Sequence, residues 1–277
     1  STICNLTQLT ELELSQNQLS GNIPQNIGNL SLLTQLSLSK NQLTGEIPAS
    51  IGNMKNLTSF SIGNNKLGGN FPESVKTCRL LTSIDLSQNE LLGIFPEIGD
   101  SLTNVKTLNI SGNKFNALPH SIGKMTELVT LNLSKNQLSQ LTNSLSTCSK
   151  LRIFDASNNQ ISSLPVDFVL LNNLTELNLA NNRFESIPQS LEYMFSLKTL
   201  NFSNNKLTTI PDYLGRFNLN SLILSNNNLS GKIPEKILSK SYNDFWLNGN
   251  NFTFSDIPKS DSIKNPLGVQ KPVMFNQ

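Results

Sequence analysis

Apolar residues recur along this chain in one fixed arrangement. The copy at 174–184 reads LTELNLANNRF. In it, Leu177 and Leu179 alternate with Asn178 and Ala180, and a period of two predicts a short β-strand with one buried face. The sequence therefore predicts one short strand per copy, with its leucines directed into a core.

The arrangement occurs in eleven copies, and each copy carries an asparagine at the same place. These asparagines are Asn17, Asn41, Asn65, Asn89, Asn113, Asn136, Asn159, Asn182, Asn205, Asn227 and Asn250. The interval is 24 residues at first (Asn17 to Asn41) and shortens to 22 (Asn205 to Asn227). A fixed period in this range is typical of a solenoid, so we predict parallel strands that stack their leucines into one continuous core.

Each of these asparagines stands where a predicted strand ends and the chain turns inward. Its amide both donates and accepts hydrogen bonds, so it can bond turn backbone in its own copy and in a neighbouring copy. A buried peptide group without a partner costs about 1–3 kcal/mol. We therefore expect the asparagines to form a buried ladder that satisfies the turns.

The pattern L-x-x-L-x-L-x-x-N-x-L resembles the leucine-rich repeat family from about Leu6 to Phe254. The resemblance implies a right-handed solenoid, or horseshoe, of about eleven repeats, which is α/β by convention but dominated by strands. It implies one parallel β-sheet on the concave face and 3₁₀ or irregular segments on the convex face. Recurrent prolines outside the strands also favour such segments over long helices. We expect the solenoid to occupy residues 1–254, and residues 255–277 to form a tail or the start of a linker to a following domain.

Two forms of repeat are mixed in the chain. The first four repeats and the tenth carry a glycine four residues after the asparagine, as in LTGEIP at 43–48, and resemble the plant-type repeat of receptor-like kinase ectodomains. The fifth to ninth repeats lack this glycine, as in FESIP at 184–188, and resemble the L-x-x-L-P repeats of bacterial and intracellular proteins. The plant-type resemblance implies a second short strand in the longer repeats, and we expect a change of twist near Asn113.

The ends and the cysteines bear on the context of the solenoid. The chain lacks the paired-cysteine cap that is usual for secreted members of the family, so we expect either a missing cover or further repeats before Ser1. The motif FTFSD at 252–256 resembles one that follows the final repeat of secreted bacterial leucine-rich repeat proteins. Cys78 and Cys148 lie three repeats apart, about 14 Å at the usual strand spacing, which is too far for a disulfide. We expect buried free thiols there.

Charge and motifs argue against several functions. Charged residues make up 14% of the chain and the net charge is +2, so there is no electrostatic case for nucleic acid or an anionic membrane. No apolar run approaches the roughly 18 residues of a membrane span. His120 is the one histidine and occupies a position that varies between repeats, so no Ser-His-Asp or Cys-His arrangement can be drawn. We expect no enzyme activity, no cofactor and no metal site.

The strand positions beside the central leucine face the concave side, and most of them are small and polar. The exceptions are a dilute acidic track and two apolar residues in adjacent repeats near the C-terminal end. The acidic residues are Glu11, Glu13, Asp85, Asp155, Glu176 and Asp244, and the apolar pair is Ile223 and Trp246. An exposed tryptophan is a typical interface anchor. The alternative is that Trp246 only closes the last repeat or packs on a following domain.

A curved solenoid offers a wide inner surface that suits proteins, peptides or glycans. We therefore expect a non-catalytic recognition module of a secreted or cell-surface protein, which binds a protein or peptide, or a glycan, through its concave face. Two alternatives stay open. The chain is a fragment of a receptor-like kinase ectodomain, or it is a structural spacer or adhesin without a specific ligand.

Overall fold

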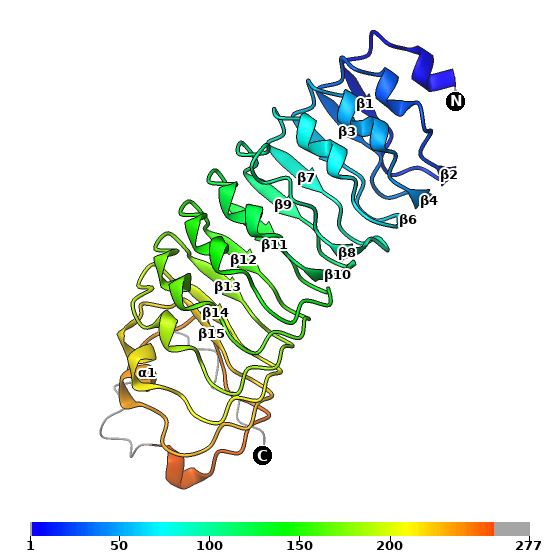
Figure 1. Cartoon of the computed structure of the whole chain (residues 1–277). Coiled ribbons are helices and arrows are strands. Elements are labelled where there is room, and N and C mark those ends of the chain that lie inside the picture. The colour runs from blue at the N-terminus through cyan, green and yellow to red at the C-terminus, as the bar shows by residue number, and fades with distance from the viewer. Residues whose placement is uncertain (1, 258–277) are drawn as a thin grey trace.

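The computed structural model describes residues 2–257, so residues 258–277 of the expected tail lie outside the described part. Three-residue strands lie side by side along an elongated body, in which each coil of chain stacks on the next (Figure 1). Eleven of them form one sheet. In sheet order they are β1 (Glu11–Glu13), β3 (Gln35–Ser37), β5 (Ser59–Ser61), β7 (Ser83–Asp85), β9 (Thr107–Asn109), β11 (Thr130–Asn132), β12 (Ile153–Asp155), β13 (Glu176–Asn178), β14 (Thr199–Asn201), β15 (Ser221–Ile223) and β16 (Asp244–Trp246). Neighbouring strands pair in parallel and in register, so the predicted strand-dominated solenoid of eleven repeats is confirmed.

The other side of most coils consists of short 3₁₀ segments rather than long helices, as predicted, whereas the fourth coil has only turns there. These are η1 (Thr2–Asn5), η2 (Ile27–Asn29), η3 (Ala49–Asn53), η4 (Glu73–Thr77), η5 (His120–Lys124), η6 (Asn143–Thr147), η7 (Val166–Leu170), η8 (Gln189–Leu191), η9 (Asp212–Arg216) and η10 (Phe254–Asp256), with one four-residue α-helix, α1 (Glu235–Leu238). A proline directly precedes several of them, such as Pro48 before η3 and Pro119 before η5. Proline suits this place because its fixed φ starts the segment and its missing N–H would have no partner there.

A second set of short strands lies beside the main sheet. Strands β2 (Ser20–Asn22), β4 (Gln42–Glu46) and β6 (Lys66–Gly68) form one small parallel sheet, and β8 (Leu92–Ile94) pairs with β10 (Lys114–Ala117). The second strand implied for the first four repeats is thus present, and the main sheet is accompanied by two small ones.

The plant-type glycine is not sufficient for that second strand. Gly45 and Gly231 both have left-handed backbone, with φ of +74° and +78°, but only Gly45 lies in a strand. Gly231 belongs to the tenth repeat, whose neighbours are not of the longer form, so it has no adjacent strand to pair with. Conversely, β10 forms in the fifth repeat, which lacks the glycine, because β8 offers a partner. The small sheets end there, just after Asn113, and the change of twist expected near that residue stays a prediction.

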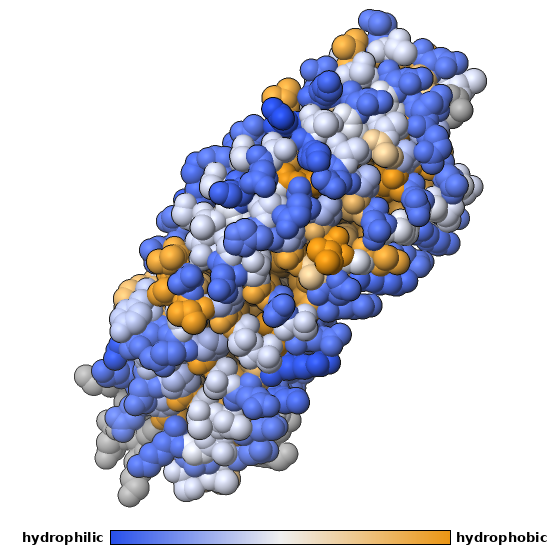
Figure 2. All heavy atoms as spheres, viewed as in Figure 1, coloured by the Kyte–Doolittle hydropathy of each residue, from blue (hydrophilic) through white to orange (hydrophobic). Residues whose placement is uncertain are grey.

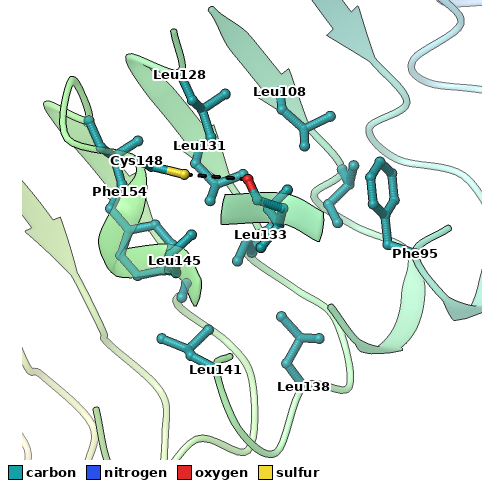
Figure 3. Packing of buried hydrophobic residues seen from close by; sticks show 14 of the residues in the cluster. Phe95, Leu108, Leu128, Leu131, Leu133, Leu138, Leu141, Leu145, Cys148 and Phe154 are labelled. Atoms are coloured by element: carbon teal, nitrogen blue, oxygen red, sulfur yellow. Dashed lines mark hydrogen bonds between the residues drawn. The ribbon is translucent and has the colours of Figure 1, made fainter. Parts of the chain in front are cut away.

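The leucines of successive coils form one continuous core. Leu128, Leu131 and Leu133 are fully buried, and Leu108 and Phe154 of the neighbouring coils pack beside them (Figure 3). Each coil therefore buries its apolar residues only by contacting its neighbours, as a solenoid requires.

Cysteine takes the place of leucine or methionine in this core. All three cysteines are buried and free. The Cys148 thiol donates to the carbonyl oxygen of Ile122 at 3.4 Å, the dashed line in Figure 3. Cys78 makes the same contact with Ile51. The expectation of buried thiols agrees with this packing.

The asparagine at each turn bridges two coils. The Asn136 Nδ2 donates to the carbonyl oxygens of Leu133 in its own coil and Ile110 in the preceding coil, at 3.0 Å each. Its Oδ1 accepts the backbone N–H of Phe115 at 3.0 Å. All ten asparagines from Asn41 onward bond the preceding coil in this way. The amides therefore tie the backbone of every turn to the next coil.

The first member of the ladder differs from the others. Asn17 is exposed, which contradicts the expectation of a buried amide at that position. It donates only within its own turn, to the carbonyl oxygens of Leu14 and Ser15, because no described coil precedes it. Five members of the ladder are less than 10% exposed, namely Asn89, Asn113, Asn136, Asn182 and Asn227. The other five, Asn41, Asn65, Asn159, Asn205 and Asn250, are half-buried.

Candidate binding surface on the concave sheet

The outward face of the main sheet carries the first and third residue of every strand. In β13, Leu177 is fully buried, whereas Glu176 is exposed and Asn178 is half-buried. The same alternation holds from β1 to β14, whereas Ser221 of β15 is also buried and Phe245 of β16 is only half-buried. Two columns of outward side chains therefore cross the sheet, here named the first-position and third-position columns. The strand pairing keeps each column in register from coil to coil.

All eight predicted candidate residues lie in these two columns. Glu11, Glu176 and Asp244 occupy the first-position column, and Glu13, Asp85, Asp155, Ile223 and Trp246 occupy the third-position column. The structure brings Ile223 and Trp246 opposite each other on adjacent strands. It spreads the acidic residues over five strands, so they do not form one cluster. Within residues 2–257, no group of three potential metal-ligating side chains lies together.

Several third-position carboxylates accept hydrogen bonds from the backbone N–H two residues further along the chain. Asp85 Oδ1 accepts the N–H of Ser87 at 3.0 Å, and Asp155 Oδ1 accepts that of Ser157 at 2.8 Å. The second oxygen of Asp155 accepts the Asn178 amide at 3.1 Å. A short side chain that bonds the backbone two residues on is a common way to shape a turn. These two aspartates therefore help to end their strands, a role that the sequence analysis missed.

The signal for that role was in the sequence. The equivalent residues of neighbouring repeats are asparagines, and Asn109, Asn132 and Asn201 accept the same i+2 backbone N–H at 2.9–3.1 Å. A position shared by Asp and Asn indicates that the side-chain oxygen, rather than the charge, is what the turn needs.

The N-terminal end of the face is acidic. Glu11 and Glu13 are exposed and, with Gln35 and three serines, line a shallow depression of about 180 Å³. Hydrogen bonds from the hydroxyl and backbone N–H of Ser15 hold the pKa of Glu13 below its usual value. Glu13 therefore stays negatively charged at neutral pH.

The C-terminal end of the face is apolar. Trp246 is 38% exposed, and Ile223 beside it is half-buried. On the same coil, Tyr242 and Phe245 stack with their ring centres 4.8 Å apart. Trp246 therefore keeps a substantial free surface beside Ile223, whereas the stacked Tyr242 and Phe245 pack against the core.

Basic residues form a further column at the start of the strands, which was not predicted from the sequence. Lys106, Arg152 and Lys198 directly precede β9, β12 and β14 and are exposed. The first four repeats have threonine at this position, as in Thr58 and Thr82. The departure from threonine was the available signal.

Other groups with chemical potential lie away from this face. His120 is exposed at the start of η5. Burial raises the pKa of the Cys78 and Cys148 thiols to about 11, so both are protonated and unreactive at neutral pH. Phe254, in the FTFSD motif, is 95% exposed in η10, whose start is capped by Thr253 and Asp256.

None of the helices within residues 2–257 combines the length and the apolar character needed to cross a bilayer.

Comparison with solved structures finds receptors and bacterial leucine-rich repeat proteins. The chain is 32% identical to a TDR receptor, with a TM-score of 0.72, and 33% identical to the plant peptide hormone receptor RGFR1 in complex with RGF2, with a TM-score of 0.62; in both cases the match covers 91% of this chain and 49% of the other. It is 29% identical to a leucine-rich repeat protein of Leptospira interrogans, with a TM-score of 0.71, covering 95% of this chain and 72% of the other. This chain therefore spans about half the length of the two receptors. No curated protein sequence matches it significantly.

Family models cover most of the solenoid. One model described as leucine rich repeat matches residues 79–138, 103–161, 128–184 and 172–229. A second model of the same description matches residues 8–30, 32–54 and 56–78. Together with the stacked coils and the asparagine ladder, these matches show that the chain belongs to the leucine-rich repeat family.

Proposed function

We propose that this chain is a non-catalytic recognition module that binds a protein or peptide through its concave sheet. The observation that carries the proposal is the outward face of the eleven-stranded sheet, where Glu11, Glu176 and Trp246 stay exposed. A wide and regular face suits an extended ligand better than a small molecule.

The relatives support a peptide ligand. RGFR1 is a plant peptide hormone receptor in complex with RGF2, and PEPR1–AtPEP1, 30% identical with a TM-score of 0.72, covers 90% of this chain and 40% of the other. By this likeness we place the chain outside the cell, as part of a secreted or cell-surface protein. An ectodomain fragment of a receptor-like kinase is one form of this proposal, since the receptors are about twice as long. A glycan ligand has no comparable support.

We further propose that Trp246 and Ile223 form the apolar anchor of the ligand. Random peptides displayed on phage, selected against the whole chain, provide the probe. We expect Trp246→Ala to weaken the selected peptides by at least about tenfold, because aromatic anchors dominate interface energies. Tyr193→Ala, which removes an exposed aromatic from the opposite side of the coils, is the matched control and should leave affinity unchanged.

Two results would count against this function. If selection enriches no peptide above background, the alternative of a structural spacer gains support. If peptides are enriched but lose affinity with Tyr193→Ala rather than Trp246→Ala, the binding face is not the concave sheet. Circular dichroism of each variant shows whether the fold is intact.

A further inference from the structure

Three long basic side chains form a regular row along one margin of the main sheet. Lys106, Arg152 and Lys198 precede the strands of the fifth, seventh and ninth repeats, and all three are exposed. The intervening repeats carry the small side chains of Val129 and Thr175 at this position, both half-buried. Basic residues thus occur at every second coil.

The backbone of this row is fixed. The N–H of Arg152 donates to the carbonyl oxygen of Val129 at 2.9 Å, and the Arg152 carbonyl accepts the N–H of Thr175 at 2.9 Å. Lys106 and Lys198 make the equivalent bonds to their neighbouring coils at 2.7–2.8 Å. The Thr175 hydroxyl also donates to the Arg152 carbonyl at 3.1 Å. The three side chains therefore start from a rigid support at constant spacing.

The charges of the row are largely uncompensated. The four ion pairs within residues 2–257 use other side chains, and the one polar contact of the Lys198 ammonium group is with the Asn218 carbonyl at 3.4 Å. Glu127 near Lys106 is paired with Lys150 at 2.5 Å. Asp155, on the strand after Arg152, has both oxygens hydrogen-bonded. The Glu176 carboxylate has no hydrogen bond or ion pair within the described residues, although its backbone N–H donates to the Arg152 carbonyl at 3.0 Å.

The spacing of the row favours one ligand conformation. Two strand spacings correspond to about 9.5 Å between successive basic residues. A polyproline II helix advances about 3.1 Å per residue and returns to the same face every third residue, which is about 9.3 Å. In an extended strand, side chains on the same face are about 6.7 Å apart for every second residue and about 13 Å apart for every fourth. An α-helix shows it at about 10.5 Å over seven residues and is marginal in water at short length. Only the polyproline II repeat matches both basic-to-basic steps.

The third-position column offers hydrogen-bond donors for the backbone carbonyl groups of such a peptide. A polyproline II chain has no internal hydrogen bonds, so its carbonyl groups seek donors. Asn109, Asn132 and Asn201 have their Oδ1 atoms fixed by backbone N–H groups. Within the described residues their Nδ2 groups have no protein partner, and they remain available as oriented donors on the same strands and coils as the basic row.

We propose that the margin formed by Lys106, Arg152 and Lys198 binds an acidic peptide in the polyproline II conformation, with a carboxylate at every third residue. The inference rests on the proposed function, since it names the class of peptide that this sheet takes. Each carboxylate pairs with one basic side chain of every second coil, and the asparagine amides donate to the peptide carbonyls between them.

Fluorescence anisotropy with designed peptides tests this at low ionic strength. The probe is a labelled peptide of five Pro-Pro-Glu triplets, and its isomer has the same composition with all glutamates contiguous. We expect the triplet peptide to bind about fivefold more tightly than the isomer, because contiguous glutamates pair with fewer of the three basic residues and each exposed ion pair contributes up to about fivefold. Added salt should weaken binding. Equal affinity of the two peptides would overturn the spacing argument.

Two triple variants with the same change of net charge locate the site. Lys106→Gln, Arg152→Gln and Lys198→Gln together should weaken the triplet peptide by at least about tenfold. Lys66→Gln, Lys124→Gln and Lys232→Gln together remove three exposed charges elsewhere and should weaken it less than twofold. Equal losses would show unspecific attraction and overturn the proposal. Both variants are compared after circular dichroism shows native spectra.

The remaining outcomes separate this inference from the proposed function. If a sulfated heparin oligosaccharide binds through the basic row and the triplet peptide does not, the ligand is a polysaccharide and the peptide inference fails. If no acidic peptide binds but phage-selected peptides still depend on Trp246, the recognition function stands and this inference fails. If neither binds, both fail.

Discussion

At the scale of single residues, the ladder asparagines hydrogen-bond the backbone of the preceding coil as well as that of their own turn. From Asn41 onward, each Nδ2 satisfies up to three carbonyl groups and each Oδ1 one N–H, as for Asn136. Their bonds to the turn backbone were predictable from the position of the residue at the end of each strand, and five of them are buried while five are half-buried. The exposure of Asn17 was not predictable, because the local pattern of the first copy is the same as that of the others and only the neighbouring coil decides burial.

Replacing a buried member of the ladder should therefore cost far more than replacing the exposed one. We expect Asn136→Ala to lower the free energy of unfolding by about 2–3 kcal/mol, because several buried peptide groups lose their partner. Asn17→Ala should cost less than about 0.5 kcal/mol, since its partners face water. Urea unfolding of both variants measures the difference. Similar losses would mean that the bridge to the preceding coil contributes little.

At the scale of elements, the coil form was readable from short motifs, but the pairing of the second strands was not. The glycine of the longer repeats correctly indicated β2, β4, β6 and β8. No glycine in the fifth repeat indicated β10, and Gly231 marks a repeat without a second strand. Both departures have the same cause, because a three-residue strand exists only where an adjacent coil supplies hydrogen bonds. The turn-forming role of Asp85 and Asp155 was likewise not predicted, because their charge was interpreted as part of a binding surface.

The glycines of the longer repeats should differ in tolerance although they share one conformation. Gly21 and Gly45 both have positive φ, but a Cβ at Gly45 would lie 2.5 Å from the Asn22 Oδ1, whereas a Cβ at Gly21 meets nothing within 4 Å. We expect Gly21→Ala to lower the unfolding free energy by about 1 kcal/mol, from the left-handed backbone alone. Gly45→Ala should cost more, about 2 kcal/mol, because the Asn22 side chain must also move. Thermal unfolding monitored by circular dichroism ranks the two; the reverse order would refute the role assigned to the small sheet.

At the scale of the whole molecule, one core extends through all eleven coils and contains two protonated thiols. Burial raises the pKa of Cys78 and Cys148 to about 11, above the ordinary value of 9.0. In the unfolded chain these thiols ionise at the lower pH, so alkaline solution favours unfolding.

The stability of the molecule should consequently fall as pH rises. The contribution of each thiol is fully present below about pH 9, the unfolded value, and is lost as pH rises through about 11. Urea midpoints measured across this window should decline. The double variant Cys78→Ala, Cys148→Ala should start lower, because of the cavities, but show a shallower decline. Identical slopes for both proteins would contradict the pKa assignment.

The hydrogen bond from each ladder asparagine to the preceding coil determines where a substitution increases local opening of the backbone. Because the Asn136 Oδ1 accepts the Phe115 N–H, a fault introduced in the sixth coil first loosens the fifth. Deuterium uptake after Asn136→Ala should accordingly accelerate at the Phe115 amide. The substitution and the amide that exchanges faster then lie one coil apart.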